Sequence, residues 1–338
     1  MTRLADYTTL RIGGPAKRLV TATSMMQLAE IVIDCDNRGE PVLLIGGGSN
    51  LLIADEGFDG TAVLVRPTDP VQVSSDGWVE AAAGEVWDEF VAQTIEQGWA
   101  GLAALSGIPG MAGATPVQNV GAYGAEVAQT LTRVTVLDRR DASLRFLPAA
   151  ECEFGYRWSK FKREPDRYVV MAASFKLAPA AVGEPVEYPE LARELGVEVG
   201  QRVAPRKVRQ AVLAVRRRKA MVLDAADHDT WSAGSFFTNP VISEAQAERL
   251  PAEAPRYPAA QGIKTSAAWL IQAAGFDRGY GKSAAQLSSR HVLAITNRGG
   301  ASAADVVALA AEIRDGVEQR FGLRLVPEPK LVGVSLDS

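Results

Sequence analysis

The chain has 338 residues, of which 47% are hydrophobic and 22% charged, and its formal net charge is −4. This length exceeds what one hydrophobic core usually supports, so we expect two or three domains. The small negative charge provides no global field for nucleic acid, which leaves only local basic patches for that function. No apolar run reaches the length of about 18 residues that a membrane helix needs.

The cysteines and histidines argue against a metalloprotein and against a disulfide-bonded secreted domain. Cys35 and Cys152 lie far apart in sequence, which is typical of packed thiols in a reducing cytoplasm. His228 and His291 are too few for a histidine-rich metal site, so we expect no metal. The first residues lack the apolar run of a signal peptide, and we expect a cytoplasmic protein.

The first part of the chain predicts a β-α-β unit. Residues 18–21 read as a strand. Ser24 begins a helix in which Gln27 would complete a capping box, and Gly39 ends it. Residues 41–45 then form a buried strand.

That buried strand ends in the run Gly46-Gly-Gly-Ser-Asn50. A dinucleotide fingerprint requires G-x-G-x-x-G between a strand and a helix, but the chain continues into residues 51–54, which look like another short strand. We therefore reject a Rossmann interpretation. The run can still bind a pyrophosphate, because glycines let backbone amides approach a ligand closely.

Residues 62–177 predict an α+β region made mostly of strands. The expected elements are a strand at 62–66, a hairpin over 71–79 that turns at Asp76–Gly77, a helix at 86–97 closed by Gly98, a hairpin of 133–137 with 144–147 that turns at Arg140–Asp141, and a strand at 167–177. Residues 178–205 are rich in Pro, Glu and Gly and are expected to be a connection.

The run Gly107–Gly124 carries small residues and two prolines with no helical or strand period. Such a loop exposes backbone amides, which suits a phosphate or a flat polar cofactor ring. Thr115, Gln118 and Asn119 add neutral hydrogen-bonding groups. Long loops without secondary structure are usually functional or disordered, and the apolar residues around Ile108 argue against disorder.

The rest of the chain predicts a mixed α/β block. The expected elements are helices at 206–219, 266–274 and 302–320, and strands at 254–258, 291–296 and 323–334. Ser302 and Asp305 form a capping pair for the last helix. The first helix ends in the basic turn Arg216-Arg-Arg-Lys219, which either complements the helix dipole or binds an anion.

Three short motifs carry candidate chemistry: Tyr156-Arg157 beside a glycine, Ser235 behind a glycine with Asn239 before a proline, and Glu328 between two prolines. Each also has an ordinary interpretation as a surface charge, a turn or a rigid connector. Ser235 lacks a G-x-S-x-G elbow and a recognisable base, so it suits a proton donor better than a nucleophile. An arginine, a carboxyl group and a hydroxyl around one centre suit stabilisation of an enolate followed by its protonation.

Six motifs in order resemble the UDP-N-acetylenolpyruvoylglucosamine reductase family and cover nearly the whole chain. They are Thr8-Thr-Leu-Arg-Ile-Gly-Gly14, Gly46–Asn50, Gly107-Ile-Pro-Gly110 through Gly124, Phe154-Gly-Tyr-Arg157, Gly234-Ser-Phe-Phe-Thr-Asn-Pro240 and Pro327-Glu328. The resemblance implies a flavoenzyme of peptidoglycan precursor synthesis, and through it a part in cell-wall formation, cell shape and cell division. NADPH would reduce FAD and leave, and flavin N5 would then pass hydride to the enolpyruvyl β-carbon to give UDP-N-acetylmuramate.

The resemblance also implies an α+β fold of three domains. Two form a vanillyl-alcohol-oxidase-type FAD-binding unit, and the third is an α/β substrate-binding domain. The expected bounds are 1–67 for the first FAD-binding subdomain, 68–205 for the second, joined by the returning residues 323–338, and 206–322 for the substrate-binding domain. A cytoplasmic monomer without nucleic-acid or membrane partners is expected.

The resemblance also implies roles for individual residues at the positions that match the family's motifs. Ser235 would donate the proton, and Arg157 and Glu328 would polarise the substrate carboxylate and stabilise the enolate. The expected FAD contacts are Arg11, Gly46, Gly47, Gly48, Ser49, Asn50, Gly107, Ile108, Pro109, Gly110, Gly113, Thr115, Gln118, Asn119, Gly121, Ala122 and Tyr123. The expected substrate contacts are Tyr156, Tyr188, Arg216, Lys219, Asn239 and His291.

The chain departs from the family pattern after Lys219, where a longer run lacks the usual Lys-x-Pro-Asp-Pro prolines, so the diphosphate contact is assigned to Lys219 within a few residues. Two alternatives stay open. One is an FAD-dependent oxidase of the same superfamily. The other is a non-catalytic nucleotide-sugar-binding protein that uses residues 216–219.

Overall fold

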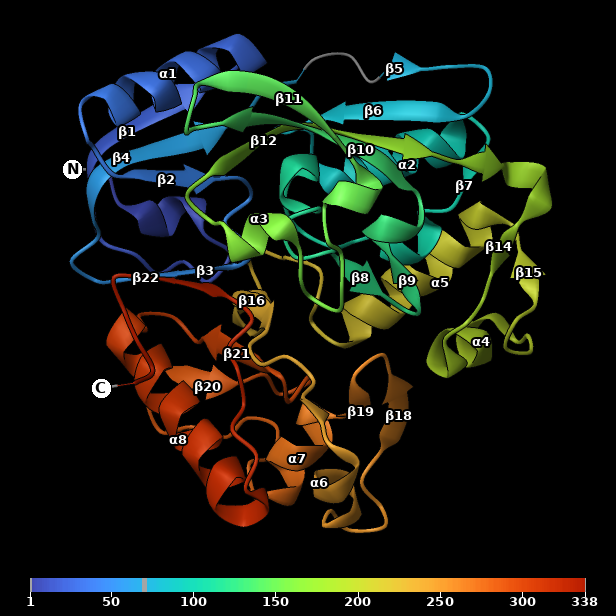
Figure 1. Ribbon diagram of the computed structural model, residues 1–338. Coiled ribbons are helices and arrows are strands. Elements are labelled where there is room, and N and C mark those ends of the chain that lie inside the picture. Colours follow the sequence, from blue (N-terminus) through green and yellow to red (C-terminus); the bar gives the residue numbers. More distant parts are fainter. Residues whose placement is uncertain (1, 69–71, 338) are drawn as a thin grey trace. The chain divides into compact units, whose positions relative to one another are not determined.

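A computed structural model describes residues 2–68 and 72–337 (Figure 1). The chain forms two compact units, each built from separate segments. Unit 1 comprises residues 2–16, 48–58 and 223–337, and unit 2 comprises residues 17–47 and 59–222 apart from 69–71. The expected division into three domains stays a prediction.

The first sheet of unit 2 confirms the predicted β-α-β unit. Its strands are β1 (Ala16–Ala22), β4 (Phe58–Val65) and β2 (Val42–Ile45), in that spatial order, and β2 runs parallel to β4. Helix α1 (Met25–Asn37) lies between β1 and β2 in sequence and packs Leu28 and Val32 against the sheet.

The cap of α1 corrects one prediction. Ser24 accepts the backbone N–H of Gln27 at 3.1 Å, as an N-cap should. The side-chain Oε1 of Gln27 accepts from the backbone N–H of Thr23 at 2.8 Å, so the reciprocal bond reaches the residue before the cap. The expected capping box at Ser24 is therefore wrong.

The second sheet of unit 2 is antiparallel and has the strand order β11-β10-β12-β6-β5. Its strands are β5 (Gln72–Val73), β6 (Trp78–Ala82), β10 (Leu131–Asp138), β11 (Ser143–Pro148) and β12 (Tyr168–Lys176). Both predicted hairpins are confirmed, although Val71 lies outside the described residues. Helices α2 (Trp87–Glu96) and α5 (Pro205–Arg218) contribute Trp87, Phe90 and Val212 to the core of this part.

Unit 2 also contains several short elements: β7 (Trp99–Ala100), β8 (Gly121–Ala122), β9 (Ala125–Glu126), α3 (Lys160–Arg163), β13 (Ala178–Pro179), β14 (Glu184–Pro185), α4 (Pro189–Leu195) and β15 (Arg202–Val203). The prediction of a plain connection at 178–205 is therefore wrong. Pro189 occupies the first turn of α4, where a missing N–H breaks no bond, and Gly196 ends the helix at φ 67°.

Unit 1 has its own core, which includes Phe236, Phe237, Ile271 and Ile313. Its elements are β3 (Leu51–Ile53), β16 (Ser232–Ser235), β17 (Val241–Ile242), α6 (Glu244–Glu248), β18 (Arg256–Ala259), β19 (Gly262–Thr265), α7 (Ala267–Ala273), β20 (Ala285–Leu287), β21 (Ala294–Asn297), α8 (Ala303–Phe321) and β22 (Lys330–Val332). One sheet has the order β16-β21-β20, with α8 alongside it (Figure 1), and another has the order β17-β19-β18.

Two predictions at the ends of unit 1 are corrected. The returning strand is only β22, and it pairs in parallel with β3 rather than with a strand of residues 68–205. The strand expected at 291–296 begins at Ala294, because residues 288–291 form a turn held by Ser288. The capping pair of Ser302 and Asp305 is confirmed as a capping box.

Among residues 2–68 and 72–337, no helix combines the length and the hydropathy that crossing a bilayer requires.

Candidate active site

Two glycine loops predicted to bind the cofactor meet backbone to backbone in unit 2. A Cβ added to Gly47 would lie 2.7 Å from Cα of Gly110, and one added to Gly46 would lie 3.3 Å from Cγ of Met111. A Cβ on Gly113 would lie 2.5 Å from Cβ of Ala83. Only glycine fits at Gly47 and Gly113 without moving a neighbour, so these residues permit a close approach of main chains.

The first turn of α2 holds the second loop in place. The backbone N–H of Trp87 donates to the carbonyl of Gly110 at 3.0 Å, and the indole Nε1 of Trp87 donates to the carbonyl of Leu105 at 3.1 Å. The backbone N–H of Ala112 donates to the carbonyl of Glu85 at 2.8 Å. The loop therefore takes its shape from a buried helix start.

Charged side chains of α2 and α5 form hydrogen bonds with the main chain of Gly107, the first residue of this loop. Asp88 on α2 accepts the backbone N–H of Gly107 at 2.6 Å. Arg216 on α5 donates from Nε to the carbonyl of Gly107 at 3.1 Å and from Nη2 to the carbonyl of Met221 at 3.0 Å. Arg209 of α5 pairs with Asp88, with Nη2 at 2.9 Å from Oδ2. Both main-chain polar groups of Gly107 are thus bonded to charged side chains.

The hydrogen bonds and the ion pair around Gly107 favour the ionised form of Asp88. Burial alone would raise the pKa of Asp88, but the hydrogen bonds from Arg209 and from the N–H of Gly107 lower it more, so its pKa lies below the ordinary value. Arg216 is only 5% exposed, and burial lowers its pKa from a very high starting value. The diphosphate contact expected of Arg216 stays a prediction.

The second half of the loop is fastened by Asn119, a residue at φ 46° that is 1% exposed. Its Nδ2 donates to Oε2 of Glu126 at 2.8 Å and to the carbonyl of Gly155 at 3.1 Å, and its Oδ1 accepts from the N–H of Ala128 at 3.0 Å. Asn119 therefore supports the loop through its side chain, and contact with FAD through that side chain stays a prediction.

Arg157 is joined to the same loop. Its Nη2 donates to the carbonyl of Gly121 at 2.7 Å, and its guanidinium carbon lies 5.3 Å from the centre of the Tyr156 ring. Arg157 has a left-handed φ of 53° in a tight turn closed by mutual backbone bonds of Gly155 and Trp158. Non-glycine residues in this conformation are strained and often mark functional positions.

Two predicted substrate contacts, Tyr188 and Lys219, are linked through α4. Tyr188 is the exposed N-cap residue of α4 and meets Tyr123 edge-on, with ring centres 5.7 Å apart. The first turn of α4 also contains Glu190, whose Oε2 lies 2.5 Å from Nζ of Lys219. Burial raises the pKa of Tyr123 to about 12, so its phenol is neutral at physiological pH.

In unit 1 the backbone of Glu328 lies next to the backbone of the residue that follows Ser235. Phe236, the residue after Ser235, accepts the N–H of Glu328 at 2.8 Å, and Phe237 forms a bridge with Pro327. Nδ2 of Asn50, in the first glycine loop, donates to the carbonyl of Glu328 at 3.3 Å. One predicted cofactor contact and two predicted catalytic residues are therefore neighbours.

A β-bulge sets the direction of Ser235. Strand β16 pairs Ser232 with Thr296 and Ser235 with Ala294, so it spans one more residue than β21. Gly234 takes the left-handed φ of 73° that this bulge needs. Because side chains alternate along a strand, the extra residue turns Ser235 toward the other face from the one that regular pairing would give.

The remaining predicted residues occupy ordinary loop or cap positions. Arg11, at φ 54°, lies with its guanidinium carbon 4.6 Å from the centre of the Trp231 ring. Asn239 accepts the N–H of Ala267 at 2.9 Å and so helps to cap α7. The N–H of His291 donates to Oγ of Ser288 at 3.1 Å. Gly48, Ser49, Ile108, Pro109, Gln118, Ala122 and Thr115 lie in the two glycine loops, with Thr115 buried.

The residues present fit an FAD. The two loops approach each other through glycine main chain, and Oγ of Ser106, next to Gly107, is buried with no hydrogen-bond partner among the described residues. Within the described part of the chain, no cluster of His, Cys, Asp and Glu could hold a metal ion.

Comparisons with known proteins agree with this geometry. A family model described as an FAD binding domain matches residues 16–146, and a model described as UDP-N-acetylenolpyruvoylglucosamine reductase, C-terminal domain, matches residues 225–332. The fold and the site thus define an FAD-containing oxidoreductase.

The relatives identify the family. The UDP-N-acetylenolpyruvoylglucosamine reductases of Cutibacterium acnes and Streptomyces avermitilis are each 53% identical over 98% of this chain, and they are covered to 90% and 94% of their own lengths. The crystal structure of the Thermus caldophilus enzyme superposes with a TM-score of 0.68 at 25% identity, over 98% of this chain and 97% of that one. The chain belongs to the UDP-N-acetylenolpyruvoylglucosamine reductase family. This confirms the resemblance, the α+β multi-domain fold, and FAD and NADPH as cofactors.

Sequence reasoning missed several charged residues of this site, namely Asp88, Glu190 and Arg209. Asp88 had a weak signal, because acidic residues in the first turn of a helix favour its dipole. No sequence pattern predicted the contacts of Asp88 with Gly107 and Arg209, because these contacts join segments far apart in sequence.

Proposed function

We propose that the chain reduces the enolpyruvyl group of UDP-N-acetylglucosamine enolpyruvate to UDP-N-acetylmuramate with NADPH, a step of peptidoglycan precursor synthesis. The family match over 98% of the chain supports this activity. The observation that carries it is the chain of contacts from Asn50 through Glu328 to Phe236, beside Ser235. It links a cofactor loop to a carboxyl group and a hydroxyl.

Bound FAD would accept hydride from NADPH and supply it to the β-carbon of the enolpyruvyl group. The chain's own residues have to hold the cofactor and keep its reacting face dry. Gly46, Gly47 and the loop from Gly107 to Gly113 would hold it through the main chain. The fixed shape of the second loop, set by α2, means that little ordering is needed on binding.

Ser235 is the proposed proton donor. Hydride addition at the β-carbon leaves the electron pair at the α-carbon, as an enolate that extends into the carboxylate. Ser235 would give its hydroxyl proton to the α-carbon, which completes reduction of the double bond. The bulge at Gly234 supports this role because it gives Ser235 an orientation that differs from regular pairing.

Arg157 and Glu328 are the proposed partners of the substrate carboxylate. Arg157 offers planar donors that match a carboxylate, and its bond to the carbonyl of Gly121 fixes where the guanidinium lies. Glu328 would stabilise the enolate if it is protonated, because only the acid form donates a hydrogen bond. These roles predict that both residues act on the second half-reaction.

The proposed contacts to the nucleotide are Tyr156, Tyr188, Arg216, Lys219, Asn239 and His291. The pair of Tyr188 and Lys219 is supported by their common link to α4. We also propose that the enzyme works as a monomer in the cytoplasm, where its charged nucleotide substrates are retained because they cannot cross a bilayer, and that cell shape and division depend on its product.

An anaerobic absorbance experiment tests this function. NADPH should bleach the flavin, and the enolpyruvyl nucleotide should restore its colour. Ser235→Ala should keep the first half-reaction and slow the second by ~10²- to 10⁴-fold, the usual contribution of a general acid. Equal slowing of both halves would remove Ser235 as the donor. Rapid oxygen consumption without a response to nucleotide would indicate an oxidase, and a chain that binds nucleotide but no flavin would indicate a binding protein.

A further inference from the structure

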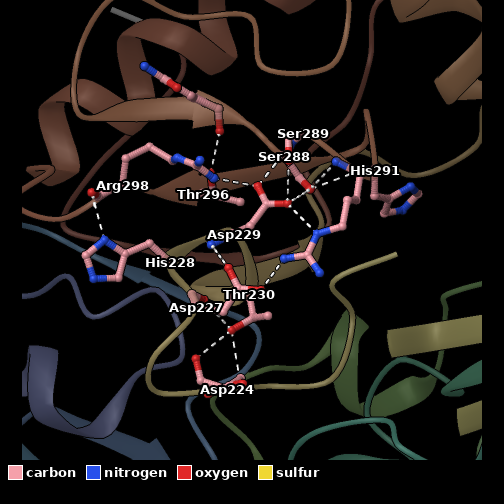
Figure 2. Close-up of polar contacts among 12 residues, drawn as sticks. Asp224, Asp227, His228, Asp229, Thr230, Ser288, Ser289, His291, Thr296 and Arg298 are labelled. Atoms are coloured by element: carbon pink, nitrogen blue, oxygen red, sulfur yellow. Dashed lines mark hydrogen bonds and ion pairs between the residues drawn. The ribbon is translucent and has the colours of Figure 1, made fainter. Parts of the chain in front are cut away.

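A buried carboxylate in unit 1 lies at the centre of a polar network that the proposed chemistry does not use (Figure 2). Asp229 is 4% exposed and lies in the short 3-10 helix His228–Thr230, just before β16. It accepts from Oγ of Ser288 at 3.1 Å, and from both the N–H and Oγ of Ser289 at 2.9 Å.

Two arginines complete the surroundings of Asp229. Nε of Arg290 lies 3.0 Å from Oδ2, and Nη1 of Arg298 lies 2.5 Å from Oδ1. Asp227 forms a second ion pair with Arg290. Burial alone would raise the pKa of Asp229, but the bonds from Ser289 and Arg290 lower it more, so the carboxylate is ionised.

The first path from Asp229 leads to His291. Oγ of Ser288 donates to Asp229 and accepts the backbone N–H groups of Arg290 and His291, each at 3.1 Å. The carbonyl of His291 in turn accepts the N–H of Ala294, where β21 begins. Asp229 therefore holds the turn that carries His291 through Ser288.

The second path leads to Ser235. Asp229 bonds to Ser288, which directly follows β20 and whose backbone N–H donates to the carbonyl of Ala294 in β21 at 2.8 Å. It also bonds to Arg298, the residue just after β21. β21 is the strand with which β16 pairs, and the pair of Ser235 with Ala294 lies beyond the bulge. A slip of one residue in this pairing would turn Ser235 to the opposite face. A carboxylate that is linked to the start of β21 through Ser288 and bonded to Arg298 just after its end opposes such a slip.

Stability alone is a poor reason for this network. The desolvation of buried ions offsets much of their attraction, and well-packed apolar residues often replace such groups without loss. The network does have a directional effect, because each of its bonds fixes one segment relative to β16. Positioning is the function that this geometry serves best.

We propose that Asp229 is a positioning residue of the reductase. It sets the β16–β21 register that orients Ser235, and through Ser288 it sets the turn that presents His291 to the nucleotide. This inference rests on the roles proposed above for Ser235 and His291.

Asp229→Asn in the FAD-loaded chain tests the proposal, with Asp227→Asn as its control. The control removes the same charge two positions earlier. Asp227 pairs with Arg290 and accepts the backbone N–H of Asp229 at 3.0 Å, a bond that the side-chain oxygen of Asn can also accept, whereas the bonds to Ser288 and Arg298 belong to Asp229. Stopped-flow absorbance would follow flavin reduction by NADPH and flavin oxidation by the enolpyruvyl nucleotide, well below the melting temperature of each variant.

Asp229→Asn should slow the limiting rate of flavin oxidation by ~10- to 100-fold, as expected for misplacement of a reacting group by about 1 Å. Asp227→Asn should stay within about threefold of wild type, since it keeps both paths. Ser288→Ala, which changes no charge, should raise the half-saturating nucleotide concentration more than it lowers the limiting rate. Equal slowing by Asp229→Asn and Asp227→Asn, or wild-type oxidation in a folded Asp229→Asn chain, would overturn the proposal.

Backbone hydrogen exchange separates this proposal from the proposed function. The amides of residues 288–297 should lose protection in Asp229→Asn and keep it in Asp227→Asn. If the enolpyruvyl nucleotide does not oxidise the reduced flavin of the wild-type protein, the proposed function fails. The exchange comparison then still decides the positioning: loss of protection in Asp229→Asn alone supports it, and equal protection in both variants overturns it.

Discussion

Asp88 accepts the backbone N–H of Gly107 at 2.6 Å, and this bond joins the first turn of α2 to the start of the longer glycine loop. The same carboxylate is paired with Arg209 of α5. Because Arg216 holds the carbonyl of Gly107 from α5, the two peptide units that flank Gly107 are oriented by charges on two helices. The loop is thereby shaped before FAD binds.

Replacement of Asp88 by Ala should weaken FAD binding ~10- to 100-fold, since hydrogen bonds to charged groups contribute about 1.5–3 kcal/mol. Titration of the apoprotein with FAD would measure this change. Glu89→Ala is the matched control, because Glu89 is an exposed acidic residue of the same helical turn. Equal weakening by both variants would mean that the helix dipole, not the bond to Gly107, is responsible.

The pKa of Asp88 predicts how its contribution depends on pH. The pKa of Asp88 is lower in the folded chain than its ordinary value of 3.8. A group with a depressed folded pKa stabilises the fold fully above its unfolded pKa and loses that effect as pH falls through the folded pKa. The difference in free energy of unfolding between wild type and Asp88→Asn should therefore be constant above about pH 5 and shrink below about pH 4 in urea titrations. A difference that grows on acidification would contradict the ion pair.

Gly47→Ala should expel the flavin. Its Cβ would lie 2.7 Å from Cα of Gly110, so the two loops have to separate, and such overpacking costs about 1–3 kcal/mol. Gly39→Ala is the control, because Gly39 has a left-handed φ of 63° but nothing within 4 Å of the added Cβ. We expect the control to lower the melting temperature slightly and remain yellow. A yellow Gly47→Ala protein with wild-type affinity for FAD would show that the loops can part without effect.

Gly234→Ala should slow flavin oxidation by the nucleotide while flavin reduction by NADPH stays near the wild-type rate. Nothing lies within 4 Å of its added Cβ, so the only penalty is the left-handed φ of 73°, which costs about 1–2 kcal/mol. Relief of that strain would shift the bulge and turn Ser235 away. Gly196→Ala has the matched φ of 67° and equally open space, at the end of α4. It should lose the same stability without the kinetic defect.

Glu190→Gln should strengthen nucleotide binding. Glu190 pairs with Lys219 at 2.5 Å, so an arriving diphosphate has to displace it if Lys219 is the diphosphate contact. Exposed pairs contribute about 0.2–1 kcal/mol, which corresponds to a gain of up to ~5-fold in affinity for UDP by calorimetry. Glu194→Gln on the same helix removes the pair with Arg218 and serves as the control. If Glu190→Gln binds UDP no more tightly than Glu194→Gln, the diphosphate contact is not Lys219.

The cysteines should be unreactive in the folded chain. Both are buried, and burial raises the pKa of Cys152 to about 11. At pH 8 only ~0.1% of such a thiol is ionised, and the thiolate is the reactive form. A thiol reagent should label neither cysteine in the native protein within minutes and both after denaturation. Fast labelling of one native thiol would mean that its surroundings open readily.

Sequence patterns predicted many of the helices and strands because turns and helix caps depend on residues close together in sequence. The turn expected at Arg140–Asp141 located the hairpin of β10 and β11, and the capping pair at Ser302 located the start of α8. The prolines in residues 178–205 misled, because a proline breaks a helix interior but favours its first turn, as Pro189 does in α4. The extent of the returning strand could not be predicted, since its pairing with β3 spans most of the chain.

For the site, the sequence by itself determined the residue types: two glycine runs, Arg157, Ser235 and Glu328 in the order of one family. Main-chain freedom and side-chain chemistry are properties of single residues, so they can be read locally. Only the tertiary structure decided how these residues are held. Gly107 is bonded to both Asp88 and Arg216, and Ser235 lies beyond a β-bulge. Asp229 is bonded to Arg298, the residue that follows β21. Those contacts join positions far apart in the chain, and their free energy depends on burial and geometry that exist only after folding.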